Sequence, residues 1–545
     1  MDINNLVSKF TQKNIILVLV FCLIFFIHLY SVNDNVFGTT DTFSYLTTAE
    51  SLTEFKYTKV YLEDEPYQDW ILPILPIMIA PFFVLDKLLG GFEFGSLLYF
   101  IRVYMVIVSL LASVVIYFMI RKLNEFNKYE SLLITLVVSF SIMFNIYSRS
   151  ILSELPYVLL VLLVFVLLLR RNSEDIWSLV LLFFLLLASI MTKASAVIFF
   201  PAILIYAVLN KKYKLFIPMF SSFFLAFVFF FLTKNDYFFG DVLGWVFSYR
   251  IVEGASFIEY KLPLIMNNIY TYLIDVLPSN VFPALKYVGF SDNVIIKVIF
   301  SLPILLISFY GYISRLNLRK RFLGKDWREY YKLRSFEGIN FIDIFYPLHM
   351  LFFLFCSIVG GNGRYMMPIL PLFIYYFFVG LRNVVSKFSL FFSMYIGLSR
   401  KLFHLVLILF FISSTIFAIG MAHSHHNKEQ PLLWEDLEEV ANYMEQNIED
   451  ADLVFSNAGG AQAPTIYLIS GVQFSALNSS AESGLDFDLD ILSSRVLFLS
   501  QTDDYDEAGS GLINLHESVY VTQNGYFSLY LVDNVDNELV FLSND

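Results

Sequence analysis

The chain has 545 residues, of which 57% are hydrophobic and only 15% are charged, and its mean hydropathy is +0.66. A soluble domain does not need so much apolar surface, and repeated apolar runs of ~18–20 residues are typical of bilayer-spanning helices. The net charge of −12 is uneven, because residues 422–545 carry 22 acidic and 2 basic residues and the remainder is net basic. So acidic a segment argues against binding to nucleic acid and against docking on anionic lipid headgroups.

The apolar runs follow one another from the N-terminus, and they predict a polytopic membrane protein. The first run has no small-residue cleavage site after it, so we interpret it as a retained helix. Eleven spans are predicted, near 14–30, 97–120, 131–148, 153–169, 176–192, 194–210, 215–233, 294–314, 341–359, 364–381 and 402–420. The run 71–89 contains three prolines and is either re-entrant or a further span, paired with one within 263–290, which gives eleven to thirteen spans.

The basic loops predict the orientation, since Lys and Arg in short loops mark the cytoplasmic side. The strongest marker is the stretch 315–334, which carries eight Lys and Arg residues. With these loops inside, the N-terminus is cytoplasmic, and two long loops, about 31–96 and 234–293, lie outside. Residues 1–421 then form a transmembrane domain, and residues 422–545 form an acidic extracytoplasmic domain.

The C-terminal segment predicts a small soluble α/β domain. Pro431 opens a stretch with apolar residues at helical spacing. Strands are predicted at 452–457, 495–500 and 538–543, and a hairpin is predicted to turn at Asn524-Gly525.

The first candidate site lies just after the first span, in GTTDTFSYLTTAESL. Asp41, Tyr45 and Ala49 stand at i, i+4 and i+8, so they share one face of a helix. A carboxylate at this place can act as a general base or a metal ligand. Asp41 can equally well be the cap of a helix that begins at Thr42.

Further ionisable residues are predicted at the outer ends of later spans. Arg149, Ser153 and Glu154 lie in SRSILSELPY, where the two charges either pair with each other or form the floor of a polar cavity. Lys193 lies between two apolar runs, and it is either a snorkelling lysine or a cation for an anionic headgroup.

Arg364-Tyr365 follows glycines at the mouth of a late span. A planar guanidinium suits a phosphate because it donates two parallel, charge-assisted hydrogen bonds, and simple anchoring at the interface is the alternative.

Other motifs are less specific. His423, His425 and His426 leave the last span as HSHH, but clustered histidines are weak evidence for a metal site, and no metal ligand is assigned. Cys22 and Cys356 lie in apolar runs and predict neither a disulfide framework nor a Cys-based metal site. Asn478-Ser479-Ser480 matches a glycosylation sequon, which occurs often by chance.

Taken together, five stretches resemble the GT-C superfamily of lipid-dependent glycosyltransferases, in particular the branch of protein O-mannosyltransferases and lipid A aminoarabinose transferases. These stretches are GTTDTFSYLTTAESL, WILPILPIMIAP, SRSILSELPYVLLVLL, MTKASAVIFFPAILIY and GRYMMPILPLFIYY. Many members have two adjacent acidic residues in the first stretch, whereas this chain has only Asp41 there, with Asp34 and Glu50 nearby.

The resemblance implies a GT-C-like architecture and a sugar donor held as a polyprenyl phosphate. It implies transfer to a glycan, lipid or protein acceptor at the outer face of the cytoplasmic membrane. Asp41 would be the base, and Tyr45, Arg149, Glu154, Lys193, Arg364 and Tyr365 would bind the substrate. A divalent metal ion is possible, as in some relatives, but no ligand set demands it.

Two other functions remain open. A transporter or flippase of lipid-linked sugars also needs charges in membrane helices, but it predicts internal repeats and charges in the middle of spans. An O-antigen ligase or polymerase uses similar lipids with a different order of motifs.

Overall fold

The computed structural model describes most of the helices and a central part of the C-terminal segment. The described residues are 12–33, 40–54, 72–90, 94–170, 173–232, 257–287, 294–316, 339–355, 363–391, 396–427, 432–448, 453–456, 462–470, 472, 496–501, 518–523 and 527–532. Several predictions lie outside them: those on Asp34, Cys356, most of the basic stretch 315–334, the sequon, the strand 538–543 and the hairpin turn at Asn524-Gly525.

The contacts divide the chain into two compact units. The first consists of Met1–Val32 and Arg102–Asn427, and the second of Asn33–Ile101 and Lys428–Asp545. The long first outer loop thus groups with the C-terminal segment. The predicted domain boundary at 421/422 stays a prediction.

The first unit is a bundle of apolar helices. In chain order it contains α2 (Gln12–Tyr30), most of α5 (Phe94–Lys122), α6 (Lys128–Ser139), α7 (Ile142–Tyr147), α8 (Glu154–Leu168), α9 (Ile176–Thr192), η1 (Ala194–Ile198), α10 (Phe199–Asn210), η2 (Tyr213–Leu215), α11 (Phe216–Leu232), α13 (Phe257–Asn268), η4 (Ile269–Val276), α14 (Leu277–Val281), α15 (Ala284–Tyr287), α16 (Val294–Leu316), α18 (Phe341–Phe355), η8 (Gly363–Ile369), α19 (Leu370–Phe391) and α20 (Ile396–His426). Within the described residues, each of the eleven predicted spans overlaps helix, so the prediction of a mostly helical protein with several apolar helices is confirmed.

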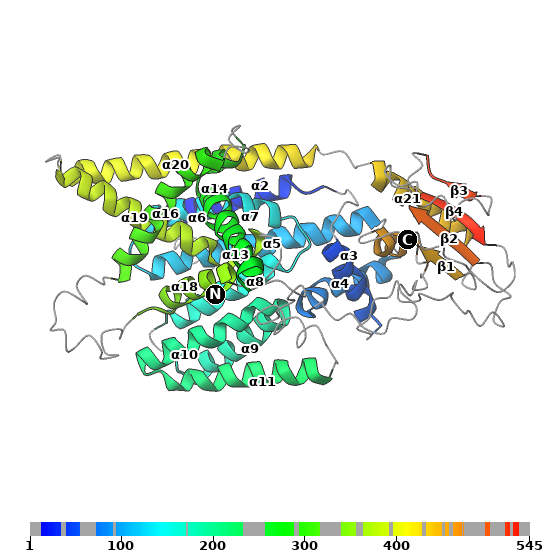
Figure 1. Cartoon of the computed structure of the whole chain (residues 1–545), viewed down its shortest axis with the longest axis horizontal. Helices are drawn as coiled ribbons and strands as arrows, with labels where there is room; N and C mark the ends of the chain where they lie inside the picture. The colour runs from blue at the N-terminus through cyan, green and yellow to red at the C-terminus, as the bar shows by residue number, and fades with distance from the viewer. Residues whose placement is uncertain are drawn as a thin grey trace, which may run out of the picture. The chain divides into compact units, whose positions relative to one another are not determined.

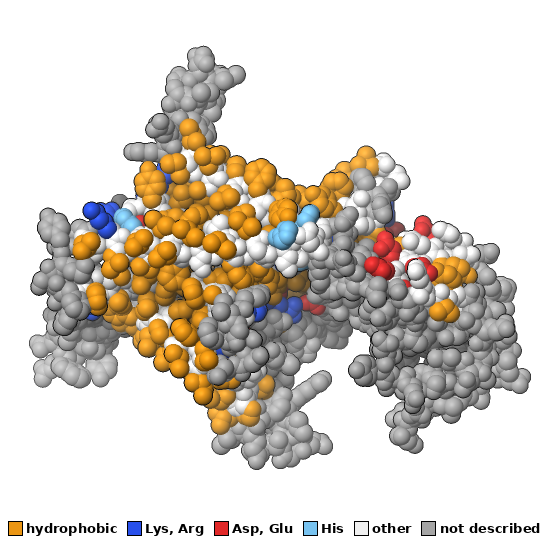
Figure 2. All heavy atoms as spheres, turned by 90° about the horizontal axis from the view of Figure 1, so that it is seen from above, with side chains coloured by type: hydrophobic (Ala, Val, Ile, Leu, Met, Phe, Trp, Pro, Cys, Tyr) orange, Lys and Arg blue, Asp and Glu red, His pale blue; other side chains and the backbone are white. Residues whose placement is uncertain are grey.

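Five helices of the described chain are long and apolar enough to cross a membrane, and five shorter apolar helices accompany them. Hydrophobic side chains cover the visible face of α20 and the helices beside it (Figure 2), as expected of surfaces that face lipid. Helices α9, α10 and α11 pack beside one another (Figure 1). The predicted span at 131–148 is broken, because α6 ends at Ser139 and α7 begins at Ile142.

Local sequence explains several helix ends. Asn127 and Glu130 form a capping box at the start of α6, and Asp175 accepts a hydrogen bond from the Ser178 amide at the start of α9. Helix α4 (Ile74–Leu89) ends at Gly90, whose φ of +95° suits glycine.

Helices α16 and α19 cross at two glycines. A Cβ atom built on Gly311 would lie 1.9 Å from the Tyr376 carbonyl oxygen, and one built on Gly380 would lie 1.9 Å from the Ile307 carbonyl oxygen. Small residues let two membrane helices approach closely, so van der Waals packing of the backbones joins α16 to α19 here.

The second unit joins two outer helices to the C-terminal segment. It contains α3 (Thr40–Leu52), α4, the start of α5, α21 (Leu432–Asn447) and α22 (Gln462–Ser470). Strands β1 (Leu453–Ser456), β2 (Val496–Gln501), β3 (Ser518–Val521) and β4 (Phe527–Val532) form a sheet in the order β1-β2-β4-β3. Strand β1 is parallel to β2, and the other two pairings are antiparallel, with an irregularity between Ser518 and Tyr520.

Candidate functional site

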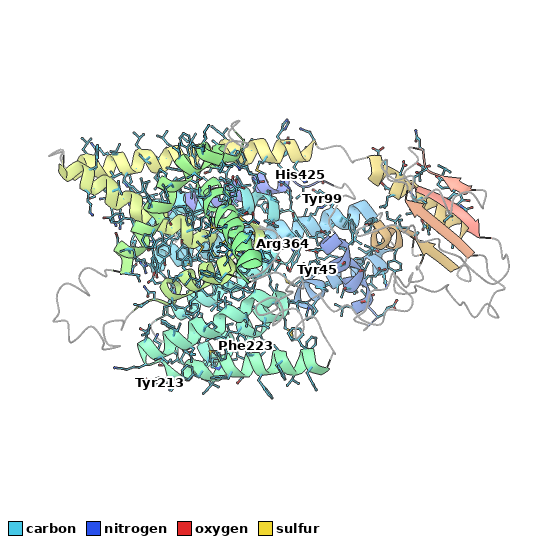
Figure 3. The ribbon with its side chains drawn as sticks, viewed as in Figure 1. Tyr45, Tyr99, Tyr213, Phe223, Arg364 and His425 are labelled. Carbon is cyan, nitrogen blue, oxygen red and sulfur yellow. The ribbon has the colours of Figure 1, made fainter. Side chains whose placement is uncertain are left out.

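Three helix ends that are far apart in sequence bring a carboxylate and two cations together. Glu154 is the first residue of α8, where the partial positive charge of a helix N-terminus favours an anion. Lys193 has an extended backbone and separates α9 from η1. Arg364 lies in η8, the short 3-10 helix that leads into α19 (Figure 3).

The charges of these three residues are close enough to form ion pairs. Lys193 Nζ lies 2.5 Å from Glu154 Oε1, and Arg364 Nε lies 3.5 Å from the same oxygen. The Glu154 side chain is only 2% exposed, whereas those of Lys193 and Arg364 are 14% and 25% exposed. One buried carboxylate therefore holds two partly accessible cations, and the group has a net positive charge.

Tyr365 packs beside both cations. Lys193 Nζ lies 5.2 Å from the centre of its ring, and Arg364 Cζ lies 5.6 Å from the same centre, both within the range of cation–π attraction. The ring also stacks on Phe353 at 5.2 Å. These contacts fix the direction in which η8 presents its side chains.

The backbone of η8 is held by a buried histidine. His349, on α18, is fully buried, and its Nε2 lies 3.0 Å from the carbonyl oxygen of Tyr365. Because a carbonyl oxygen only accepts, Nε2 must carry the hydrogen. On the other side of η8, a Cβ atom at Gly363 would lie 2.9 Å from Val276 Cγ2, so η4 packs directly against this glycine.

A small pocket opens at this group. It is lined by Glu154, Tyr157, Lys193, Ser195, Arg364, Tyr365, Met367 and Pro368. Within the described part of the chain, the buried Oε2 of Glu154 has no hydrogen-bond partner.

Arg149 is buried near the start of α8 and donates a hydrogen bond to Asn145 Oδ1 at 3.1 Å. Asn145 in turn donates to the Ala418 carbonyl oxygen in α20. The sequence left open whether Arg149 pairs with Glu154, and the structure gives Glu154 ion pairs with Lys193 and Arg364. Ser153 is also buried, at the start of α8. The role of Arg149 in substrate binding stays a prediction.

Asp41 and Tyr45 lie in the second unit, on α3. The helix starts at Thr40, so Asp41 belongs to its first turn, and the predicted helix start at Thr42 falls two residues late. Asp41 and Tyr45 are half-buried, and Ala49 on the same stripe is fully buried. The expected helical face therefore exists, and the role of Asp41 as base stays a prediction.

The histidines after the last span make aromatic contacts. The Tyr30 hydroxyl lies 3.1 Å from His423 Nδ1, and the Tyr30 ring stacks on His426 at 4.7 Å. His425 Nδ1 lies 3.0 Å from the Ser31 carbonyl oxygen. Over the residues that the structure describes, no group of three His, Cys, Asp or Glu side chains is placed to hold a metal ion.

Sequence reasoning missed two buried groups. His349 gave no signal, because a single histidine in an apolar run is usually a core residue. The second group joins Asp343 to Arg315 at 3.0 Å and to the Tyr376 hydroxyl at 2.7 Å. Arg315 was expected to begin a loop, but it lies in the last turn of α16 and is mostly buried. The acidic residue in FIDIFYP, inside an apolar run, was the available signal.

Comparison with known proteins shows which fold the chain shares. Residues 91–233 match the family model described as dolichyl-phosphate-mannose-protein mannosyltransferase. No curated protein matches the sequence.

Solved structures match over nearly the whole chain. ArnT from Cupriavidus metallidurans bound to undecaprenyl phosphate has a TM-score of 0.55 at 12% identity, covering 96% of this chain and 98% of that one. The apo oligosaccharyltransferase from Archaeoglobus fulgidus has a TM-score of 0.56 at 10% identity, covering 91% and 70%. AglB of the same organism, in complex with an inhibitory peptide and a dolichol-phosphate, has a TM-score of 0.52 at 11% identity, covering 89% and 69%.

The family model covers two of the five stretches, SRSILSELPYVLLVLL and MTKASAVIFFPAILIY, and the solved structures show the same fold. The resemblance is therefore confirmed, and the chain is a polytopic membrane protein with the fold of the GT-C glycosyltransferases.

Proposed function

We propose that the protein is an integral-membrane glycosyltransferase that moves a sugar from a polyprenyl-phosphate donor to an acceptor at the extracytoplasmic face. The observation that carries the proposal is the pair of cations, Lys193 and Arg364, held by the buried Glu154 beside a small pocket. A group with net positive charge at the end of membrane helices suits the phosphate of a lipid.

The donor class is supported by what the similar structures hold. ArnT is bound to undecaprenyl phosphate, and AglB is in complex with a dolichol-phosphate. We extend this class of lipid to the present chain, with Arg364 and Lys193 as the groups that contact the phosphate. The apolar surfaces of the neighbouring helices would hold the isoprenoid chain.

The proposed reaction breaks the bond between the anomeric carbon and the phosphate oxygen and forms a bond from that carbon to the acceptor. Asp41 takes the proton of the acceptor hydroxyl or amine during the attack. The leaving phosphate gains negative charge, which Arg364 and Lys193 stabilise. Removing one such contact typically raises the barrier by about 2–4 kcal/mol.

A divalent metal ion has no assigned place in this scheme. The oligosaccharyltransferase from Archaeoglobus fulgidus has also been solved in complex with zinc and sulfate. The steps proposed above are those that side chains of this chain would carry out.

The orientation is part of the proposal. With the basic loops in the cytoplasm, Glu154, Lys193 and Arg364 lie at the outer ends of their helices, and the acidic C-terminal segment lies outside. The acceptor would then be an extracytoplasmic glycan, lipid or protein.

The test uses the full-length protein in lipid nanodiscs with a panel of polyprenyl-phosphate sugars and candidate acceptors. Release of free polyprenyl phosphate is followed by mass spectrometry for the wild type, Asp41→Asn, Lys193→Gln and Arg364→Gln. Lys297→Gln is a matched control, because Lys297 is also 14% exposed and pairs with Asp275 at 3.0 Å, on other helices.

We expect loss of release in the first three variants and near wild-type release in the control. Equal loss in all four variants would contradict the assignment of the site. Export of an intact lipid-linked sugar without release would instead favour the transporter.

A further inference from the structure

The C-terminal half of α3 lies between two other helices of its own unit. Helix α4 packs on one side, where Lys87 Nζ donates a hydrogen bond to Thr53 Oγ1 at 2.9 Å and lies 3.8 Å from Glu54. Helix α22 of the C-terminal segment also packs against α3. Helix α3, which carries Asp41, is thus supported by residues more than 400 positions further along the chain.

Tyr467 lies on α22, the helix of the C-terminal segment that packs against α3. It is only 8% exposed, and its neighbours Thr465 and Ile466 are fully buried. Burial raises the pKa of Tyr467, and the charges of Glu50 and Glu54 add to this rise.

Glu50 lies where the three helices meet. Burial raises the pKa of Glu50 to about 7, the charge of Lys87 lowers it to a smaller extent, and the charges of Glu54 and Asp86 raise it slightly. Its Oε2 is buried and, over the described chain, has no hydrogen-bond partner. We call Glu50, Glu54, Lys87 and Tyr467 the Glu50 junction.

Helix α22 is in turn fixed to the rest of the C-terminal segment. It packs on α21, and α21 is tied to strand β3 and the residues that follow it. The Tyr443 and Tyr520 rings stack at 4.0 Å, and Thr522 Oγ1 donates to Asp436 Oδ2 at 2.5 Å. A continuous set of contacts therefore runs from the sheet through α21 and α22 to α3.

The helix transmits this support to Asp41. At 1.5 Å per residue, Asp41 and Glu50 are separated by about 14 Å along the axis of α3. A helix of this length is stiff, so a shift of its C-terminal half also shifts its first turn. Misplacement of a reacting group by about 1 Å can lower a rate roughly a hundredfold.

We propose that the C-terminal segment positions α3 through the Glu50 junction, and that Tyr467 is thereby a positioning residue for Asp41. The placement of α22 on α3 is independent of the proposed glycosyl transfer, and only the consequence for the rate rests on it. The C-terminal segment is then part of the structure that holds the base, and not only a surface for recognising the acceptor.

The first experiment tests the placement without any activity. Glu50→Cys and Tyr467→Cys are combined in the full-length chain with Cys22→Ser and Cys356→Ser, and the protein in nanodiscs is treated with a short bis-maleimide, each end of which adds one cysteine thiol. We expect an intramolecular cross-link between positions 50 and 467, mapped by mass spectrometry and missing from the two single-cysteine variants. A folded double variant without the cross-link would overturn the proposal.

The second experiment measures the consequence for transfer. We expect Tyr467→Ala to lower kcat by roughly tenfold to a hundredfold while the KM for the donor stays within about twofold, since the donor lipid is held elsewhere. Tyr467→Phe, which keeps the ring, should restore most of the rate. Lys297→Gln changes a residue of the first unit, outside this set of contacts, and should leave the rate unchanged.

The two experiments separate the possible failures. A cross-link in a protein with no transfer activity for any donor would refute the proposed function and leave the placement intact. A cross-link together with equal kcat values for wild type and Tyr467→Ala would refute the positioning role.

Discussion

Replacing Glu154 by glutamine should destabilise the protein and, at the same time, tighten its binding of a phosphate lipid. The carboxylate lies 2.5 Å from Lys193 Nζ and 3.5 Å from Arg364 Nε. At an effective dielectric constant of ~20, these distances correspond to attractions of about 7 and about 5 kcal/mol. The cost of burying three charges offsets most of this, and breaking a buried pair usually costs about 3–5 kcal/mol.

The net stability change should lie near the lower end of that range, about 3 kcal/mol, because the glutamine amide oxygen still accepts a hydrogen bond. The charge of the three side chains rises from +1 to +2. For a phosphate about 6 Å away, one unit of charge is worth about 3 kcal/mol at the same dielectric constant, so we expect at least a tenfold gain in affinity for undecaprenyl phosphate.

The assay compares thermal unfolding and undecaprenyl phosphate binding of wild type and Glu154→Gln in nanodiscs. Glu130→Gln is the control, because Glu130 is also a mostly buried carboxylate at a helix start, with His404 at 2.7 Å as its partner. The control should lose stability without any gain in lipid affinity. A folded Glu154→Gln protein that binds the lipid no more tightly than wild type would refute the electrostatic role of the site.

Three further changes test other parts of the structure. Burial raises the pKa of Glu50 to about 7. Between pH 4.5 and 7 the native state therefore holds more protons than the unfolded state, and the Glu50 carboxylate lowers the stability of the fold as pH rises through this window. Glu50→Gln should thus raise the unfolding midpoint relative to wild type at pH 8 and not at pH 4. His349→Phe removes the hydrogen-bond donor of the Tyr365 carbonyl oxygen and should weaken undecaprenyl phosphate binding by about 1–3 kcal/mol. His349→Gln keeps a donor, so in the same titration this variant should bind the lipid more tightly than His349→Phe. Asp343→Asn removes the nearer of two carboxylates beside the buried Arg315, at 3.0 Å, and leaves Glu125 at 3.4 Å. It should cost up to about 3–5 kcal/mol in unfolding experiments, most of which the double variant Asp343→Leu with Arg315→Met should recover.

The positions of the apolar helices along the chain could be predicted because hydropathy is a local property. The Lys and Arg residues of the loops predicted that Glu154, Lys193 and Arg364 lie on one side, and the structure brings these three side chains together. Each lies at a helix end, so a small error in the length of a span does not move it to the other side.

Two kinds of feature could not be predicted. The π-helix η4 and the break after Ser139 depend on packing against other helices, because their sequences are as apolar as those of regular spans. The packing of α22 on α3 joins residues more than 400 positions apart, and one sequence contains no signal for such a pair.

The glycine crossing of α16 and α19 also affects residues far from it. Arg364 lies in η8, which runs directly into α19, and Gly380 lies about 15 Å along α19 from the end of η8. A methyl group at either glycine has no space, so the two helices would have to move apart. Helix α19 and η8, which carries Arg364, would then shift together, although no residue of the pocket would have been substituted. In a collection of inactive variants, substitutions at Gly311 and Gly380 would therefore be expected beside those at the pocket. The distance of a residue from the pocket would not predict how strongly its substitution lowers activity.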